Sequence, residues 1–159
     1  MSTAPTTIKI LVLDVDGVLT DGRLYYAADG EALKVFHVRD GHGIKSLLSA
    51  GIEIAIISGR SSTALERRAR ELGIRHICQG IEDKGVALAN LLHELGFSAA
   101  QAACLVDDTP DLPMMHIVGL PVAVADAHPK VLAAAKLVTR LPGGAGAVRE
   151  LADQILGES

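Results

Sequence analysis

The chain has 159 residues, a common size for one domain, so we expect a single domain over residues 1–159. Its formal net charge of -4 argues against nucleic acid or an anionic membrane surface as a partner. Hydrophobic residues make up 49% of the chain and aromatic residues only 3%, so Ala, Val, Leu and Ile must build the core. Such a core is usual for a parallel sheet covered by helices.

The N-terminal segment 1–7 lacks the charged and then apolar order of a signal peptide. The chain also has no apolar run of about 18 residues, the length that would predict a membrane-spanning helix. We therefore expect a cytoplasmic protein with no membrane partner. Cys78 and Cys104 lie far apart beside apolar runs, and we interpret them as buried, reduced thiols.

Apolar runs alternate with amphipathic stretches from the first residues to the last. In chain order, the runs that predict buried strands are 8–13, 52–57, 75–77, 102–106 and 120–124. The stretches with helical spacing of apolar residues are 43–50, 62–72, 83–95 and 127–135. This alternation predicts an α/β fold with a doubly wound, Rossmann-like parallel sheet.

Two segments depart from the alternation. Residues 24–26 and 33–37, joined around the Asp29-Gly30 turn signal, predict a β-hairpin inserted after the first strand, over about 24–37. Near the other end, a Gly-rich turn leads into a final amphipathic helix, and together they cover about 142–157.

Ligands of doubly wound sheets bind at the carboxyl ends of the strands. Asp14 and Asp16 follow the first expected strand, and two carboxylates there are costly unless they bind a cation or accept hydrogen bonds. One arrangement has Asp14 as a nucleophile facing the pocket and Asp16 as a proton donor and acceptor. The alternative is a helix cap and turn.

The second expected strand ends at Ser58, Gly59 and Arg60. A small hydroxyl, free backbone N–H groups and a guanidinium suit an anion, although Ser58 could also be a plain helix cap. Lys84 opens the third expected helix, where its charge opposes the helix dipole. It would neutralise negative charge in a phosphate site, and the alternative is a solvated surface lysine.

The fourth expected strand ends in a run of acids. Asp107, Asp108 and Asp111 lie within five residues, which favours ligation of a hard cation over a simple helix start. All these groups should lie on one rim of the sheet, because each follows a strand or opens the next helix. A nucleophile, an acid/base, phosphate-binding groups and metal ligands are what phosphoryl transfer requires.

These motifs resemble the haloacid dehalogenase-like phosphatases over nearly the whole chain, from LVLDVDGVLTDG through IISGR and EDKG to VDDTPDLPMM. Within that superfamily the chain resembles the 3-deoxy-D-manno-octulosonate 8-phosphate (KDO 8-P) phosphatases. The segments that carry this closer resemblance are DVDGVLTDGRLYY, KVFHVRDGHGIK, ISGRSS, QGIEDKG and GGAGAVRE. Val106 stands where that family often has Gly, and we expect the strand end to tolerate it.

The resemblance implies a role for each residue of the site. Asp14 would become an aspartyl-phosphate, and Asp16 would protonate the leaving group and then activate water. Ser58 and Lys84 would hold the phosphoryl group, and Gly59, Arg60 and Arg68 would bind substrate. Mg²⁺ would be held by Asp14, the Asp16 carbonyl and Asp107, with Asp108 beside it as an outer or alternate ligand.

The spacing of the motifs leaves no room for a cap domain, because the segments 16–58 and 60–84 hold only the hairpin, two helices and a strand. An open site needs something else to exclude water. The resembling family assembles as tetramers whose hairpins form a shared barrel, with the Gly-rich tail reaching an active site. We therefore expect a homotetramer.

Three alternatives stay open at this point. A response-regulator receiver domain uses similar groups, but its adjacent acids follow the first strand, whereas Asp14 and Asp16 are separated by one residue. An inactive scaffold would not need the intact site residues. Another sugar-acid phosphate, such as a nine-carbon ulosonate 9-phosphate, would suit the same arginines. His37, Arg39, Asp40 and His42 could be pocket, interface or plain surface residues.

Overall fold

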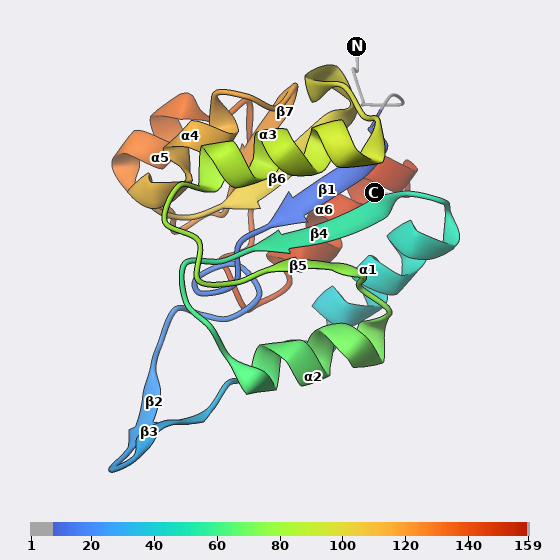
Figure 1. Cartoon of the computed structure of the whole chain (residues 1–159). Helices are drawn as coiled ribbons and strands as arrows, with labels where there is room; N and C mark the ends of the chain where they lie inside the picture. The colour runs from blue at the N-terminus through green and yellow to red at the C-terminus, as the bar shows by residue number, and fades with distance from the viewer. Residues whose placement is uncertain (1–7, 159) are drawn as a thin grey trace.

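The computed structural model describes residues 8–158 and is built around one parallel sheet (Figure 1). Its strands lie in the order β5-β4-β1-β6-β7-β8. Their bounds are β1 Ile10–Leu13, β4 Glu53–Ile57, β5 His76–Cys78, β6 Ala102–Val106, β7 Leu120–Ala123 and β8 Leu137–Val138. Counted along the chain within this sheet, the order is that of the dinucleotide-binding fold, 3-2-1-4-5-6. The predicted doubly wound α/β fold is confirmed.

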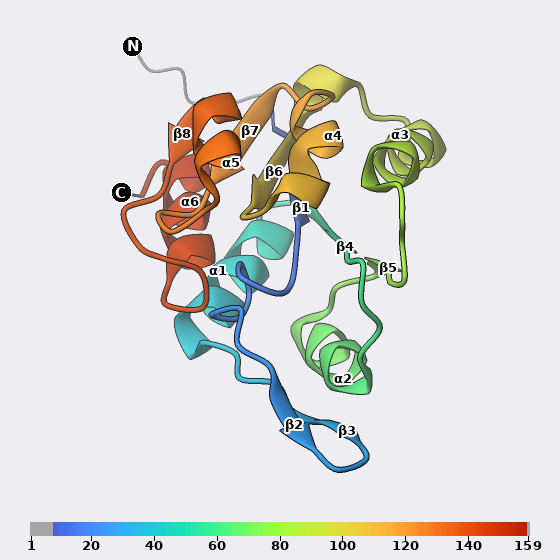
Figure 2. The ribbon, with the colours of Figure 1, turned by 90° about the vertical axis from the view of Figure 1, so that its left-hand side faces the viewer.

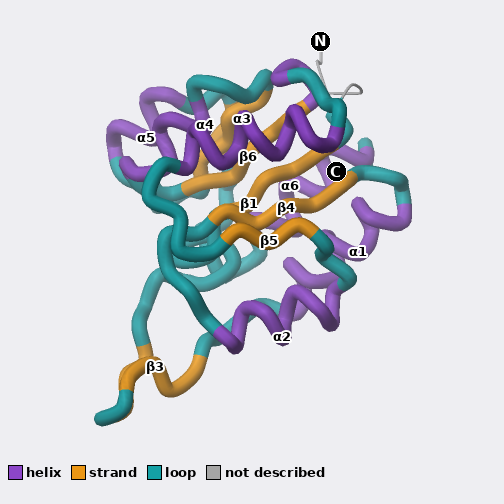
Figure 3. Tube along the Cα trace, viewed as in Figure 1, coloured by secondary structure: helices purple, strands orange, loops and turns teal. Residues whose placement is uncertain are grey.

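Helices cover both faces of the sheet (Figures 1, 2 and 3). On one face lie α1 (Val38–Ser49), α2 (Thr63–Leu72) and α6 (Ala147–Leu156), with α1 packed along α6. On the other lie α3 (Lys84–Leu95), α4 (Leu112–Met115) and α5 (Pro129–Ala134). Two short 3-10 helices, η1 (Ala99–Gln101) and η2 (Thr109–Asp111), flank β6.

The central strands form the core. Every residue of β1 and β6 is buried, because these strands have a neighbour on each side and helices on both faces. Val106 ends β6 fully buried, in register with Ala123 of β7, so its side chain packs within the sheet. Cys104 is buried and Cys78 only half-buried, and both are free thiols. Burial raises the pKa of Cys104 to about 12, which keeps it protonated.

Helix α1 begins at Val38, earlier than the sequence pattern predicts. The His37 side chain accepts a hydrogen bond from the Arg39 backbone N–H and caps the helix. Gly41 and Gly43 lower helix propensity and so hide this first turn from a sequence-based prediction. Both glycines are closely packed: a Cβ at Gly41 would have to displace the Arg68 guanidinium, and one at Gly43 would lie 3.0 Å from Arg149 Cα.

The hairpin forms where the sequence predicts it, but with different strands. They are β2 (Tyr25–Ala27) and β3 (Gly30–Leu33), so the second strand begins earlier than the predicted segment 33–37 and shares only Leu33 with it. Gly30 has φ +122° and opens β3 directly after the two-residue turn. Figure 1 shows the hairpin projecting beyond the carboxyl ends of the sheet strands.

The short elements β8 and α4 escaped prediction, because two and four residues show no periodicity. Within residues 8–158, no helix has the length and apolar character needed to cross a membrane. The expectation for segment 1–7 concerns residues outside this described range.

Candidate active site

A cavity opens at the carboxyl ends of β1, β4 and β6, where the strand order reverses. This is the position at which doubly wound sheets bind ligands. Of the predicted site residues, the structure brings together at this cavity Asp14, Asp16, Ser58, Gly59, Arg60, Lys84, Asp107 and Asp108. Arg68 lies elsewhere, as described below.

Lys84 lies at the centre of the site. It is the first residue of α3, and its side chain is only 6% exposed. Its Nζ donates hydrogen bonds to Asp14 Oδ1 at 3.0 Å and to Asp111 Oδ1 at 2.6 Å. The alternative of a solvated surface lysine is therefore wrong. A buried ammonium between two carboxylates remains charged, because both acids raise the pKa of Lys84 against the effect of burial.

Sequence reasoning grouped Asp111 with Asp107 and Asp108 as acids of a possible cation site but gave it no role of its own. It is fully buried, and its Oδ2 accepts hydrogen bonds from the backbone N–H groups of Asp107, at 3.2 Å, and Asp108, at 3.3 Å. It thus fixes the loop after β6 and anchors Lys84 at the same time. The only signal in the sequence was its position as the third acid of DDTPD.

Three carboxylates converge as if around a cation. Asp14, Asp107 and Asp111 each offer an oxygen, and these oxygens lie within 4.8 Å of one another. Asp107 Oδ1 is buried and has no hydrogen-bond partner among residues 8–158. Burial, and then the charge of Asp111, raise the pKa of Asp14 to about 6. Burial, and then Asp14, raise that of Asp107 to about 9. An all-oxygen donor set with excess negative charge fits Mg²⁺.

The loop after β1 depends on close glycine contacts. Asp14 Oδ1 accepts a hydrogen bond from the Val15 backbone N–H at 2.8 Å, which helps to fix the carboxylate. Gly17 has φ +89°, and a Cβ there would collide with Asp107 Oδ2. The Gly-rich turn before α6 packs on the same loop: a Cβ at Gly143 would collide with the Gly17 carbonyl oxygen.

The loop after β4 is shaped for an anion. Ser58 is 2% exposed, and its Oγ accepts a hydrogen bond from the Arg60 backbone N–H at 3.3 Å. Ser62, and not Ser58, caps α2 through the Leu65 backbone N–H. The alternative of Ser58 as a plain helix cap is therefore wrong, and Ser58 lines the cavity with Gly59 and Arg60.

Asp16 lies on the hairpin side of the cavity. Its Oδ1 is 2.9 Å from Lys34 Nζ, and its Oδ2 is 3.4 Å from Arg60 Nε. The nearby Tyr26 hydroxyl, and then Glu31 and Asp16, raise the pKa of Arg60 against the effect of burial. Sequence reasoning missed Glu31 and Lys34 because their approach to the site depends on how the hairpin folds back.

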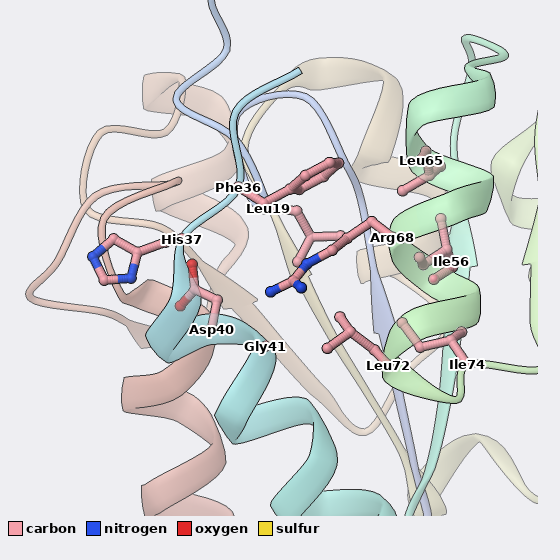
Figure 4. A pocket seen from close by; sticks show the side chains of 11 residues that line it. Leu19, Phe36, His37, Asp40, Gly41, Ile56, Leu65, Arg68, Leu72 and Ile74 are labelled. Carbon is pink, nitrogen blue, oxygen red and sulfur yellow. The ribbon is translucent and has the colours of Figure 1, made fainter. Parts of the chain in front are cut away.

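Arg68 lines a different, small cavity between α1 and α2. Figure 4 shows its side chain running from α2 toward Asp40 and Gly41 of α1. His37 and Asp40 line the same cavity, whereas Arg39 and His42 are exposed. The structure thus does not bring Arg68 together with Asp14 and Lys84.

Comparison with known proteins agrees with this geometry. A haloacid dehalogenase-like hydrolase family model matches residues 77–150. The 3-deoxy-D-manno-octulosonate 8-phosphate phosphatase KdsC of Escherichia coli strain K12 is 50% identical over 149 residues, which cover 94% of this chain and 79% of that protein.

Two solved structures are similar over almost the whole chain. The cobalt-bound deoxy-D-mannose-octulosonate 8-phosphate phosphatase of Haemophilus influenzae has a TM-score of 0.95 and 46% identity, covering 98% of this chain and 91% of the other. The 3-deoxy-D-manno-octulosonate 8-phosphate phosphatase of Moraxella catarrhalis, in complex with magnesium, phosphate and KDO, has a TM-score of 0.94 and 41% identity. That match covers 98% of this chain and 90% of the other.

The chain combines a doubly wound sheet with an Asp-Val-Asp loop, a buried lysine and an acidic cluster at one rim. About half of its residues are also identical to those of one kind of phosphatase. This chain therefore belongs to the KdsC family of 3-deoxy-D-manno-octulosonate 8-phosphate phosphatases, among the haloacid dehalogenase-like hydrolases.

Proposed function

We propose that this protein is a Mg²⁺-dependent phosphatase that hydrolyses 3-deoxy-D-manno-octulosonate 8-phosphate to KDO and phosphate. The reaction belongs to the biosynthesis of lipopolysaccharide sugar. The observation that carries the proposal is the contact of Asp14 with the buried Lys84, beside Asp107 and Asp111, in a chain 50% identical to KdsC. Family membership removes the receiver-domain alternative.

The proposed reaction has two steps on Asp14. Its carboxylate attacks phosphorus, the ester P–O bond breaks, and Asp16 gives its proton to the leaving alkoxide. Asp16 then takes a proton from water, which attacks the aspartyl-phosphate and frees inorganic phosphate and Asp14. Ser58 and Lys84 hold the phosphoryl oxygens, and the location of both at the cavity of Asp14 supports this role.

The Asp14 and Asp107 carboxylates and the Asp16 backbone carbonyl would hold Mg²⁺, with Asp108 as an outer or alternate ligand. The unpaired, buried Asp107 Oδ1 supports this assignment. When bound, the ion neutralises phosphoryl charge and polarises the P–O bonds. Asp111 completes the acidic cluster but is already hydrogen-bonded to Lys84 and two backbone N–H groups, so we propose a positioning role for it.

We propose that Gly59 and Arg60 contact the substrate, as their location at the cavity supports. Arg60 offers a planar, charged group that suits a sugar-acid carboxylate. We extend the same proposal to Arg68. To reach a substrate beside Asp14, its guanidinium has to leave the cavity next to Gly41.

We also propose a homotetramer located in the cytoplasm. The hairpin exposes apolar side chains, with Tyr26 63% and Leu33 51% exposed, which favours association through this element. The two free cysteines fit a reducing compartment. Light scattering at micromolar protein tests the assembly, and a monomeric mass would contradict it.

The function is tested by phosphate release from a panel of phosphorylated sugars with Mg²⁺. The panel contains the eight-carbon 3-deoxy-octulosonate 8-phosphate, a nine-carbon ulosonate 9-phosphate and neutral hexose phosphates. We expect strong preference for the eight-carbon acid, and loss of all turnover in Asp14→Asn and in EDTA.

Each other outcome identifies a different alternative. Preference for the nine-carbon acid would keep the chemistry and change the substrate. No release from any member of the panel would leave the inactive scaffold as the remaining interpretation.

A further inference from the structure

The hairpin turns two charged side chains, Glu31 and Lys34, toward Asp16 and Arg60, and turns apolar side chains toward solvent. The Lys34 side chain, directly after β3, is only 4% exposed, and that of Glu31 is 20% exposed. Leu33 and Val35, the neighbours of Lys34, are 51% and 52% exposed. This reverses the usual distribution, in which charged groups stay in water. The charged side of the hairpin therefore has a specific binding partner within the chain.

That partner is Asp16. Lys34 Nζ lies 2.9 Å from Asp16 Oδ1 and 3.0 Å from Glu31 Oε2. An ammonium removed from water requires such close carboxylates, so Lys34 is held tightly between them. On its other oxygen, Asp16 faces Arg60 Nε at 3.4 Å. Each oxygen of the proposed acid/base thus meets one cation.

Glu31 closes these contacts into a ring. Its Oε2 accepts a hydrogen bond from Arg60 Nη2 at 3.1 Å, and its Oε1 accepts one from Ser62 Oγ at 2.9 Å. Around the ring, charges alternate from Glu31 to Lys34, Asp16 and Arg60 and back to Glu31. Because Ser62 caps α2, the ring also ties the hairpin to the start of that helix.

We propose that Lys34 and Glu31 are positioning residues of the phosphatase. Lys34 holds the Asp16 carboxylate in the orientation in which it can protonate the leaving-group oxygen and then take a proton from water. Glu31 holds the Arg60 guanidinium at the angle from which it meets the carboxylate of a sugar-acid phosphate. This proposal rests on the function proposed above, and it makes the hairpin of the same chain a part of the active site.

The two residues act through different partners, so their loss should change different kinetic constants. Lys34→Met should lower kcat about 100-fold with little change in KM, because misplacement of a catalytic group slows the chemical step. Glu31→Gln should raise KM about tenfold for the sugar-acid phosphate and leave KM for a neutral hexose phosphate unchanged, because only the acid needs Arg60.

Steady-state kinetics on both substrates test this, with Lys45→Met and Glu94→Gln as matched controls on exposed helical positions. Both controls should behave as the wild type does. Lys34→Arg keeps the charge and should recover part of kcat. Thermal unfolding identifies any variant that has lost its fold, and Glu31→Gln remains informative if Lys34→Met has lost it.

The outcomes separate this proposal from the function on which it rests. If the wild-type protein is active and Lys34→Met and Glu31→Gln have the same kinetic constants as their controls, the positioning roles are wrong and the proposed function stands. An equal rise in KM for acid and neutral substrates in Glu31→Gln would show that Glu31 does not act through Arg60. Wild-type protein that releases no phosphate would overturn both proposals.

Discussion

Buried charge distinguishes the active site from the rest of the molecule. Lys84 and Asp111 have side chains that are 6% and 1% exposed, and they form an ion pair at the edge of the hydrophobic core. Burying such a pair costs desolvation energy that its attraction barely offsets. An arrangement of this kind is maintained for chemistry more than for stability.

Removal of Asp111 should therefore be costly in a specific way. Asp111→Ala leaves Lys84 buried with one carboxylate fewer and leaves two backbone N–H groups unpaired. We expect a loss of about 3 kcal/mol in the free energy of unfolding, measured by urea denaturation. Asp29→Ala, on the exposed hairpin turn, is the control and should be neutral. Equal stability of the two variants would contradict a structural role for Asp111.

Carboxylates with raised pKa values make metal binding depend on pH. Without metal, burial raises the pKa of Asp14 to about 6 and of Asp107 to about 9. Because the pKa values of these groups are higher in the folded state, the groups stabilise the fold at low pH. This stabilisation is lost as the pH rises through the folded-state pKa values. A bound cation requires them ionised and reverses this effect. The rise in melting temperature caused by Mg²⁺ should be larger at pH 8.5 than at pH 6, and an equal rise would contradict ligation by these acids.

At this scale, the sequence was sufficient to group most of the site. Asp14, Ser58, Lys84 and Asp107 follow strands or open helices, and parallel strands bring such positions to one rim. Glu31 and Lys34 could not be found in this way, because a hairpin has no fixed direction relative to the sheet. Arg68 could not be placed in this way either, because its helical position does not reveal which cavity its long side chain enters.

At the scale of elements, α1 and α6 are joined by a buried aspartate. Gly146 precedes α6 without a side-chain cap, and Asp40 of α1 supplies one by accepting a hydrogen bond from the Arg149 N–H at 3.0 Å. Asp40 is 1% exposed, and burial raises its pKa although the hydrogen bond from the Arg149 backbone N–H lowers it. The contact also fixes the Gly-rich turn that packs on the loop after β1.

Asp40→Ala should lower the free energy of unfolding by about 1 kcal/mol, because α6 loses its only side-chain cap among residues 8–158. Asp40→Asn keeps an acceptor oxygen and should recover most of that loss. His42→Ala, exposed on the same helix, serves as the control for chemical denaturation. A variant Asp40→Asn as unstable as Asp40→Ala would show that charge, and not capping, is what α6 requires.

Gly143 tests whether the turn before α6 supports catalysis. Gly143→Ala places a methyl group against the Gly17 carbonyl and should displace the loop that carries Asp14 and Asp16. We expect kcat to fall about 100-fold, since small misplacement of catalytic groups is sufficient for such a loss. Gly51→Ala, at φ +85° with open space around it, should cost about 1 kcal/mol of stability but leave kcat unchanged. If Gly143→Ala and Gly51→Ala have the same kcat, the turn before α6 does not position the catalytic loop.

The sheet and the long helices could be predicted because their patterns are local. The buried strands β1 and β6 are continuous apolar runs, and α2 and α3 begin at Ser62 and Asp83 caps. The first turn of α1 could not be predicted, because its glycines are explained only by the packing of Arg68 and α6 against it. The second hairpin strand lies earlier than predicted because the two-residue turn at 28–29 already pairs Ala27 with Gly30.

At the scale of the whole molecule, the exposure of the active site and the apolar outer side of the hairpin are connected, because residues 8–158 form no cap domain. The cavity lies at the ends of the sheet strands, and the hairpin, which projects beyond these ends (Figure 1), contacts two of the lining residues, Asp16 and Arg60. Exposed Leu24, Tyr26 and Leu33 make a monomer prone to association. Association through the hairpin would cover these residues and limit access of water to the site.

Substitution on the outer side of the hairpin should therefore change the oligomeric state and leave the fold of each subunit intact. Leu24→Asp and Leu33→Asp place a carboxylate where the proposed interface needs apolar contact, so light scattering should show a mass near one chain instead of four. Val86→Asp introduces the same charge at an equally exposed apolar position on α3, away from the hairpin, and should keep the wild-type mass. If all three variants have the wild-type mass, subunits do not meet through the hairpin. If the Leu33→Asp monomer also loses kcat while its melting temperature is unchanged, the subunit interface contributes to exclusion of water from the active site.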